Sequence, residues 1–254
     1  MKLYYKELGS GKPLILLHGL FGSSDNLYSV AKELAKKYKV FVIDERNHGN
    51  SPWSDVMNYD VIADDIKEFM EDHSIENALI VGHSMGGKAS MKLAQKYPQL
   101  VRKLVVSDIA PRYYAPHHQT ILAGLNNVNL ETLESRTDAD TQLAAHIKDL
   151  PTRQFLLKNL GRDENGQFKW KINLSVITKQ IEFVGAGIND SEVINTPTLF
   201  VRGGKSDYIK LTDEPIIKKI FPNSTLKTIE GASHWIHAEK PAEFINLILE
   251  FDSE

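Results

Sequence analysis

The amino-acid sequence predicts an α/β fold in which a mostly parallel sheet is covered by helices on both faces. Short runs rich in Val, Ile and Leu recur along the chain. Each run is too short for a helix and too continuously apolar for a strand with one face in water, which is typical of a buried parallel strand. Longer stretches of helical periodicity separate the runs, and this alternation indicates a sheet covered on both sides.

The expected elements follow one another in chain order. The strand-like runs are Leu14–Leu17, Val40–Ile43, Leu79–Val81, Leu104–Val106, Leu199–Val201 and Leu226–Ile229. The helical stretches between them are Leu27–Tyr38, Tyr59–Asp72 and Met85–Tyr97. Pro98 ends the third helix because proline cannot continue one, and Pro241 is a favoured first residue for a closing helix after Lys240.

The size, composition and charge of the chain are typical of a globular domain that binds neither nucleic acid nor a membrane. Its 254 residues fit one large domain, and 42% hydrophobic with 25% charged residues is ordinary for a soluble globular protein. Because 30 basic and 33 acidic residues give a net charge of −3, we expect no nucleic-acid partner. No apolar run approaches the ~20 residues of a membrane span and the start resembles no secretion signal, so we expect no membrane partner. The absence of cysteine excludes disulfides and suits a cytoplasmic location.

The strand–helix alternation stops in the middle of the chain. Successive helical patterns occur there, at roughly His118–Leu125, Asp138–Lys148, Pro151–Leu160 and Leu174–Phe183, and Asn165-Gly166 marks one tight turn. These helices could simply pack on the edge of the sheet. A long insertion at the carboxyl edge of a sheet more often shapes a pocket. We therefore predict a core of residues 1–111 and 195–254 with a helical lid of residues 112–194.

A G-x-S-x-G pattern, Gly82-His83-Ser84-Met85-Gly86, joins one of the expected strands to the helix that follows. This is the context that a nucleophile elbow requires. The turn is so tight that side chains at positions 82 and 86 would clash, which explains both glycines. The turn lifts the hydroxyl of Ser84 above the sheet edge, where the amino terminus of the helix favours negative charge. The pattern therefore predicts a nucleophilic serine.

A serine hydroxyl needs a base within hydrogen-bond reach to become a nucleophile. His234 follows the last expected strand, at the same sheet edge as Ser84. His237 is its nearest rival among the nine histidines, but it leads into the final helix.

No H-E-x-x-H spacing occurs, and His234-x-x-His237 alone is a weak metal signal, so we expect no metal site. Because the base must be neutral, we expect activity to rise with pH through roughly 6–7.

Backbone amides can stabilise an oxyanion where the chain turns away from its sheet. The turn His18–Gly22 follows the strand-like run Leu14–Leu17 and offers such amides. We predict the amides of Leu20 and Met85 as the two donors, with Phe21 as the substitute for Leu20. A plain strand-to-helix connection remains the alternative for this turn.

Four motifs in this order, spanning nearly the whole chain, resemble those of the α/β-hydrolase superfamily. They are His18-Gly19-Leu20-Phe21-Gly22, Asp44-Glu45-Arg46-Asn47-His48-Gly49-Asn50-Ser51, the Ser84 elbow and Gly231-Ala232-Ser233-His234-Trp235. The resemblance implies an eight-stranded, mostly parallel sheet with a helical lid insertion. It has one departure, Ser233, where relatives usually carry glycine.

Three motifs narrow the resemblance to small bacterial carboxylesterases and acyl-CoA thioesterases and their mitochondrial abhydrolase-domain relatives. They are Arg46-Asn47-His48-Gly49, Asp108-Ile109-Ala110-Pro111 and Arg202-Gly203-Gly204-Lys205-Ser206-Asp207-Tyr208. The superfamily usually places the acid that orients the histidine after the seventh strand, which selects Asp207. The narrower group places it after the sixth strand, which selects Asp108 and is favoured here. Both carboxylates would emerge between Ser84 and His234, since neighbouring strands lie only ~4.8 Å apart.

The resemblance implies a serine hydrolase of small carboxylic esters that works without a cofactor. Its substrates would be esters of short to medium acyl chains or acyl-CoA thioesters, cleaved through an acyl-enzyme on Ser84. Carbon–carbon bond hydrolases and the lyase of menaquinone synthesis use the same serine and histidine and form the first alternative. A non-catalytic small-molecule receptor on the same scaffold is the second.

Overall fold

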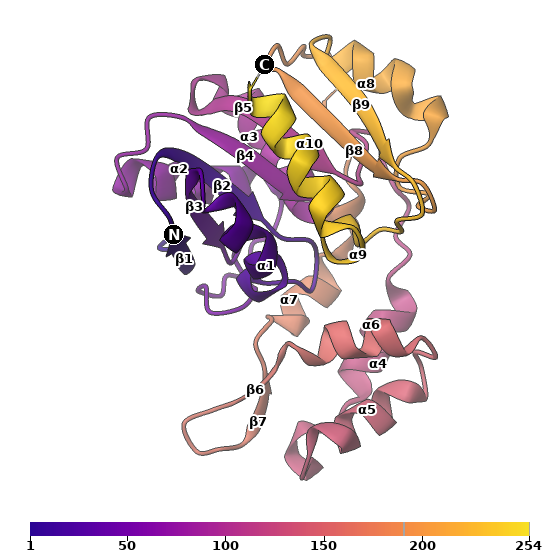
Figure 1. The fold of residues 1–254 in the computed structure, drawn as a ribbon. Helices are drawn as coiled ribbons and strands as arrows, with labels where there is room; N and C mark the ends of the chain where they lie inside the picture. The colour runs from indigo at the N-terminus through magenta and orange to yellow at the C-terminus, as the bar shows by residue number, and fades with distance from the viewer. Residues whose placement is uncertain (190, 254) are drawn as a thin grey trace.

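A central sheet carries its strands in the order β1-β3-β2-β4-β5-β8-β9 in the computed structural model, which describes residues 1–189 and 191–253 (Figure 1). β1 runs antiparallel to β3, and every other neighbouring pair is parallel. The strands are β1 (Tyr5–Leu8), β2 (Lys12–Leu17), β3 (Tyr38–Ile43), β4 (Ala78–His83), β5 (Val101–Ser107), β8 (Thr198–Gly203) and β9 (Ser224–Ile229). The α/β fold with a mostly parallel sheet is confirmed.

The sheet contains seven strands in the described residues, where the family resemblance implied eight. Five of them, β2, β3, β4, β5 and β8, coincide with the apolar runs of the sequence. β9 coincides with the strand-like run Leu226–Ile229, in which Lys227 and Thr228 are exposed because β9 is an edge strand. The seventh, β1, is an edge strand of sequence YKEL that is only half-buried, so it has no continuous apolar run. β6 (Leu160–Arg162) and β7 (Phe168–Trp170) do not supply the eighth, because they pair only with each other around the Asn165-Gly166 turn.

Ten α-helices and four short 3₁₀ turns complete the described residues. The helices are α1 (Ser24–Leu34), α2 (Tyr59–Asp72), α3 (Met85–Lys96), α4 (Gln119–Asn127), α5 (Arg136–Ala144), α6 (Leu150–Leu157), α7 (Leu174–Lys179), α8 (Glu214–Ile220), α9 (Ile236–Glu239) and α10 (Pro241–Ser253). The 3₁₀ turns are η1 (Pro98–Leu100), η2 (Leu130–Thr132), η3 (Ile181–Gly185) and η4 (Leu211–Asp213). None of the described helices combines the length and the apolar character needed to cross a bilayer.

Helices bury both faces of the sheet, so each strand directs alternate side chains into two separate clusters. In β2, Leu14 and Leu16 pack with residues of α1 and α10, while Ile15 and Leu17 pack with residues of α2, α3 and α8. Figure 1 shows α1 and α10 on the near side of the sheet. Burial on both faces is why these strands are apolar at successive positions.

A segment inserted between β5 and β8 carries α4 to α7 and the small hairpin of β6 and β7. Figure 1 shows α4, α5 and α6 grouped away from the sheet. Its two ends lie side by side, since the Tyr114 amide donates to the carbonyl of Gly185 at 2.8 Å. The fully buried Lys88 of α3 donates from Nζ to the carbonyls of Arg112 (2.6 Å) and Ala186 (2.7 Å). One side chain of the core therefore fastens both ends of the insertion.

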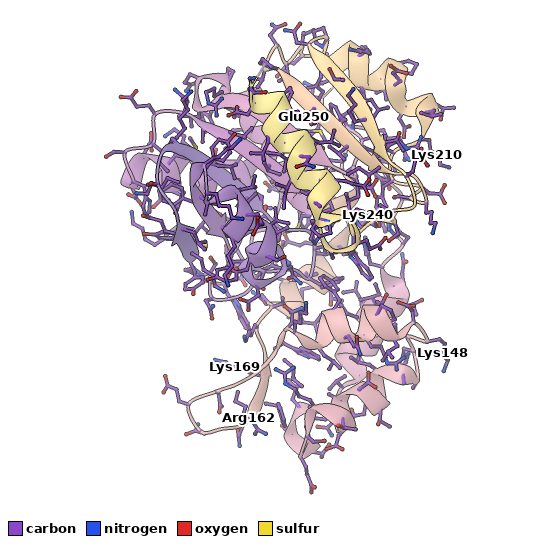
Figure 2. All side chains as sticks on the ribbon, viewed as in Figure 1. Lys148, Arg162, Lys169, Lys210, Lys240 and Glu250 are labelled. Carbon is purple, nitrogen blue, oxygen red and sulfur yellow. The ribbon has the colours of Figure 1, made fainter. Side chains whose placement is uncertain are left out.

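Many charged side chains lie on the exterior of the core and of the inserted segment. Figure 2 labels Lys148, Arg162 and Lys169 on the insertion and Lys210 and Glu250 on the core, and all five are exposed. Acidic and basic groups are both present at the surface, in keeping with the small net charge.

The turn after β3 is held by buried polar side chains. The carboxylate of Asp44 accepts from the amides of Ser24 (2.6 Å) and Asn50 (2.9 Å). Arg46 forms a two-pronged pair with Asp65 of α2, from Nε at 2.6 Å and from its terminal nitrogen at 2.8 Å. These partners give Asp44 and Arg46 a structural role behind the sheet edge.

Two fully buried histidines fix the turn His18–Gly22 beside this region. His18 donates from Nδ1 to the carbonyl of Gly19 (2.9 Å) and accepts at Nε2 from the amide of Glu45 (3.0 Å). His48 donates from Nδ1 to the carbonyl of Arg46 (3.0 Å) and accepts at Nε2 from the amide of Phe21 (3.3 Å). Burial lowers the pKa of His18 to about 4 and that of His48 to about 3, so both rings are neutral and each serves as one donor and one acceptor.

These lowered pKa values predict a loss of stability in mild acid. Below about pH 6.5 the unfolded chain binds a proton on each histidine, whereas the folded chain stays unprotonated there until about pH 4 or below. Folding stability therefore falls as pH drops through this window, by on the order of 1.4 kcal/mol per pH unit for each histidine. Urea unfolding of wild type and His48→Gln at pH 7, 6 and 5 should show a shallower pH slope in the variant. Parallel slopes would contradict the neutral, buried state of His48.

Candidate active site

Ser84 lies in a strained turn between β4 and α3. Its φ is +52° and its ψ is −113°, a conformation that few residues with a side chain adopt. A Cβ on Gly82 would lie 2.2 Å from the carbonyl oxygen of Gly86, and one on Gly86 would lie 2.6 Å from the carbonyl oxygen of Leu17. Only glycine fits at either position, as the sequence pattern predicts. The amide of Ser84 donates to the carbonyl of Ser107 (3.0 Å), which ties the turn to the end of β5.

His234 and Asp108 meet at the neighbouring strand ends. His234 donates from Nδ1 to Oδ2 of Asp108 at 2.8 Å. The carboxylate is fully buried, and its Oδ1 accepts from the amide of Gly203 at 3.0 Å. Asp108 has a φ of +52°, which turns its side chain away from the direction of the strand. The arrangement leaves Nε2 of His234 free of Asp108 and able to accept a proton.

Asp207, the other carboxylate considered from the sequence, is not part of this contact. Its side chain is exposed, and in the described residues it makes no hydrogen bond or ion pair with His234. The preceding residue, Ser206, turns inward instead and donates from its hydroxyl to Oδ2 of Asp108. The structure therefore brings Asp108, and not Asp207, to the imidazole.

Two aromatic side chains hold His234 in place. His83, next to Ser84, donates from Nε2 to the carbonyl of His234 at 2.9 Å. The ring of Tyr208 stacks on the imidazole of His234, with centroids 3.9 Å apart and planes inclined by 19°. The Tyr208 hydroxyl is hydrogen-bonded to Nε2 of His117, in the inserted segment, at 2.6 Å. His234 is thus held at three points: its backbone carbonyl by His83, its ring face by Tyr208 and its Nδ1 atom by Asp108.

Ser233, the departure from the family motif, has a partner of its own. Its amide donates to Oε2 of Glu239 at 2.8 Å, and its hydroxyl donates to the same carboxylate. The side chain therefore braces the start of the His234 loop against α9.

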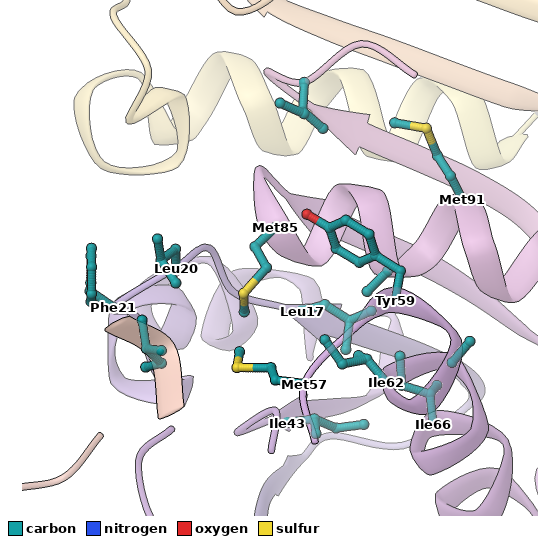
Figure 3. Close-up of a cluster of buried hydrophobic side chains, with 14 of the residues drawn as sticks. Leu17, Leu20, Phe21, Ile43, Met57, Tyr59, Ile62, Ile66, Met85 and Met91 are labelled. Atoms are coloured by element: carbon teal, nitrogen blue, oxygen red, sulfur yellow. The ribbon is translucent and has the colours of Figure 1, made fainter. Parts of the chain in front are cut away.

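The amides of Leu20 and Met85 are both unpaired in the described residues. Met85 is the first residue of α3, where an amide has no partner inside the helix. Leu20 follows Gly19, on which a Cβ would lie 3.2 Å from the Cβ of Ser84. The substitute donor Phe21 is already engaged, since its amide donates to His48. The side chains of Leu20, Phe21 and Met85 belong to one buried hydrophobic cluster, at the edge of which Figure 3 shows Leu20 and Phe21 side by side.

A cavity of about 170 Å³ opens at Ser84. Ser84 and His234 both line it, together with Leu20 and residues of the inserted segment such as Ile121 and Phe155. In the described residues the hydroxyl of Ser84 makes no hydrogen bond to His234. Such bonds in free enzymes are often long and shorten only in the substrate complex.

Histidine is the only type of ionisable side chain with a charge change near neutral pH that lines the cavity in the described residues. Burial lowers the pKa of His118 to about 4 and that of His237 to about 4, and burial together with His237 and His234 lowers the pKa of His83 well below its usual value. These three imidazoles are neutral at ordinary pH. No group of three or more His, Asp or Glu side chains in the described part of the chain is arranged to hold a metal ion.

Sequence patterns missed the contacts of Ser206, Tyr208 and His83. Ser206 and Tyr208 belong to the motif that contains Asp207. The motif indicates that this segment lies at the site, but within it only the carboxylate of Asp207 is a candidate acid. His83 lies inside the elbow pentapeptide, and its link to the His234 carbonyl spans 151 positions. No local pattern reveals a contact over that separation.

Comparisons with known proteins identify the family of this chain. A family model described as the alpha/beta hydrolase fold matches residues 12–241. The sn-1-specific diacylglycerol lipase ABHD11 of Xenopus laevis is 39% identical over 249 residues, which cover 95% of this chain and 80% of the relative. Esterase YbfF of Escherichia coli is 35% identical over 240 residues, which cover 94% of this chain and 92% of the relative.

One solved structure is especially similar. A marine microorganism esterase superposes with a TM-score of 0.96 at 44% identity, covering 98% of this chain and 99% of the other. The family model spans most of the chain, and relatives above 30% identity cover nearly all of it. The chain therefore belongs to the α/β-hydrolase fold family and is a hydrolase of the esterase/lipase type.

Proposed function

We propose that the protein cleaves carboxylic esters through an acyl-enzyme on Ser84, with His234 as its base and Asp108 as the acid of the triad. The observation that carries the proposal is the hydrogen bond from Nδ1 of His234 to Asp108, which leaves Nε2 to act in the cavity that Ser84 also lines. The esterase and lipase names of the relatives support the same reaction class.

The reaction has two balanced halves. In the first, Nε2 of His234 takes the proton of the Ser84 hydroxyl as the oxygen bonds to the ester carbonyl carbon, and it then gives that proton to the departing alcohol. In the second, His234 takes a proton from water as water bonds to the acyl carbon, and it returns that proton to Ser84 as the carboxylic acid leaves. The amides of Leu20 and Met85 donate to the oxyanion in both halves.

The buried carboxylate of Asp108 suits the role of the acid. It keeps the proton of His234 on Nδ1, so that Nε2 faces the nucleophile, and its negative charge stabilises the imidazolium that forms during each half. The amide of Gly203 and the hydroxyl of Ser206 compensate for the burial of this charge. Asp207 has no such surroundings, and we assign it no part in the chemistry.

The inserted segment, residues 112–194, acts in this proposal as a lid over the cavity. His117, His118, Ile121, Phe155 and Leu156 of this segment line the cavity, so the segment forms the wall opposite the sheet edge. Esters of short to medium acyl chains are the proposed substrates. Acyl-CoA thioesters would undergo the same attack and belong in any substrate panel.

The first test is replacement of the nucleophile. Ser84→Ala should abolish the hydrolysis of p-nitrophenyl acetate, and the wild type should release p-nitrophenol in a burst equal to the enzyme concentration if deacylation is slower than acylation. A fluorophosphonate probe should label the wild type and leave the variant unlabelled. Full activity in Ser84→Ala would end the proposal, and hydrolysis of carbon–carbon bonds without ester turnover would favour the alternative class.

A matched pair of variants tests the choice of acid. Asp108→Asn should lower kcat by on the order of 10⁴-fold, because the amide would hold the imidazole in the wrong tautomer. Asp207→Asn removes a similar charge from the surface and should change kcat less than about twofold. Circular dichroism at pH 7 serves as the folding control. Equal effects of the two substitutions would refute the assignment of Asp108.

The pH profile tests the base. Burial lowers the pKa values of His118 and His237 to about 4 and that of His83 well below its usual value, so these three rings are already neutral at pH 7. Because a general base must be neutral to accept a proton, kcat/KM should rise with pH through roughly 6–7 if His234 is the base. A flat profile would count against His234. Recovery of full activity after return from pH 5 to pH 7 separates this titration from acid unfolding.

A further inference from the structure

Two cavities of unequal size meet at Ser84. The larger, of about 170 Å³, is the one already described. The smaller, of about 20 Å³, is bounded by Ser84 and Met85, by Ile109 after β5, and by Ile181 and Val184 of η3. The nucleophile therefore stands between two spaces into which the two halves of an ester could extend.

The position of His234 distinguishes the two cavities. His234 lines the larger cavity and does not line the smaller one. If Ser84 and His234 act as proposed above, His234 must protonate the departing oxygen, so the alcohol has to lie within hydrogen-bond reach of Nε2. The acyl group extends from the same carbonyl carbon in another direction. We propose that the larger cavity receives the alcohol of the ester and the smaller cavity receives its acyl group.

The volume of the smaller cavity sets the length of the acyl chain. Measured in the same way, the smaller cavity offers about 20 Å³ and the larger about 170 Å³, so the acyl group has to be the shorter half of the ester. An acetyl group fits the smaller cavity best, and a longer acyl chain is pressed against the side chains of Ile181, Val184 or Ile109. The larger cavity has room for an alcohol of several carbon atoms beside Phe155 and Trp235.

The chemistry of the walls adds a second restriction. No Lys, Arg, Asp or Glu of the described chain lines either cavity. A charged group on the substrate would lose its hydration there without gaining a partner, which is costly. The preferred substrates are therefore acetate esters of uncharged, apolar alcohols.

Two ester series test this assignment. The first series keeps p-nitrophenol as the leaving group and varies the acyl group from acetate to butyrate to hexanoate. Each kcat/KM is divided by the rate at which hydroxide hydrolyses the same ester. This ratio should fall by about tenfold or more for each methylene beyond the capacity of the cavity. With acetate as a constant acyl group, ethyl, benzyl and naphthyl acetates should all be accepted. Preference for hexanoate over acetate in the wild type would overturn the assignment.

Matched substitutions locate the two subsites. Ile181→Ala and Val184→Ala enlarge the smaller cavity, and each should raise the ratio of butyrate to acetate turnover by about tenfold. Ile121→Ala, which enlarges the larger cavity, should leave that ratio unchanged and alter only the alcohol series. The reverse pattern would overturn the proposal, and the wild-type series decides the matter if a variant does not fold. Absence of hydrolysis of every ester would instead refute the proposed function itself.

Discussion

The close contact between the elbow and the end of β2 is the constraint on which the rest of the site depends. Gly86 approaches the carbonyl oxygens of Leu17 and His18 so closely that a methyl group in its place would lie 2.6 Å from each. This contact presses the first turn of α3 onto the sheet. It helps to hold Ser84 in its strained conformation and fixes Met85, the first residue of α3, whose amide is unpaired in the described residues. A serine carried by a mobile loop would have neither property.

Parallel strands explain how residues far apart in sequence come to this point. The paired ends of β4, β5, β8 and β9 lie in one row, so Ser84, Asp108 and His234 each leave the sheet at the same edge. Fully apolar runs identify such strands in a sequence, and the pentapeptide identifies the elbow. For this reason the sheet core, the serine and the histidine could be predicted. The edge strand β1 could not, because it is only half-buried and has two charged residues, Lys6 and Glu7, at its centre instead of an apolar run.

The choice between Asp108 and Asp207 depends on backbone detail that no sequence pattern contains. Asp108 follows β5 and Asp207 follows β8, the two strands that lie between β4, which leads to Ser84, and β9, which leads to His234. A positive φ at Asp108 directs its carboxylate inward. From the segment after β8, the hydroxyl of Ser206, and not the side chain of Asp207, contacts this carboxylate. The roles of the histidines were hidden for a similar reason. His18, His48 and His83 serve as neutral donors or acceptors to backbone groups, and the partner of each is known only once the chain has folded.

The ammonium group of Lys88 has a consequence for how this chain can diversify. It binds the carbonyls of both Arg112 and Ala186, the points at which the insertion departs and returns, from a position one helical turn beyond Ser84. A change of length that shifts Arg112 or Ala186 would therefore remove a partner from a buried nitrogen of the helix that begins just after Ser84. Variation of the insertion is tolerated best where it leaves both of these ends in place and keeps contacts such as that of His117 with Tyr208.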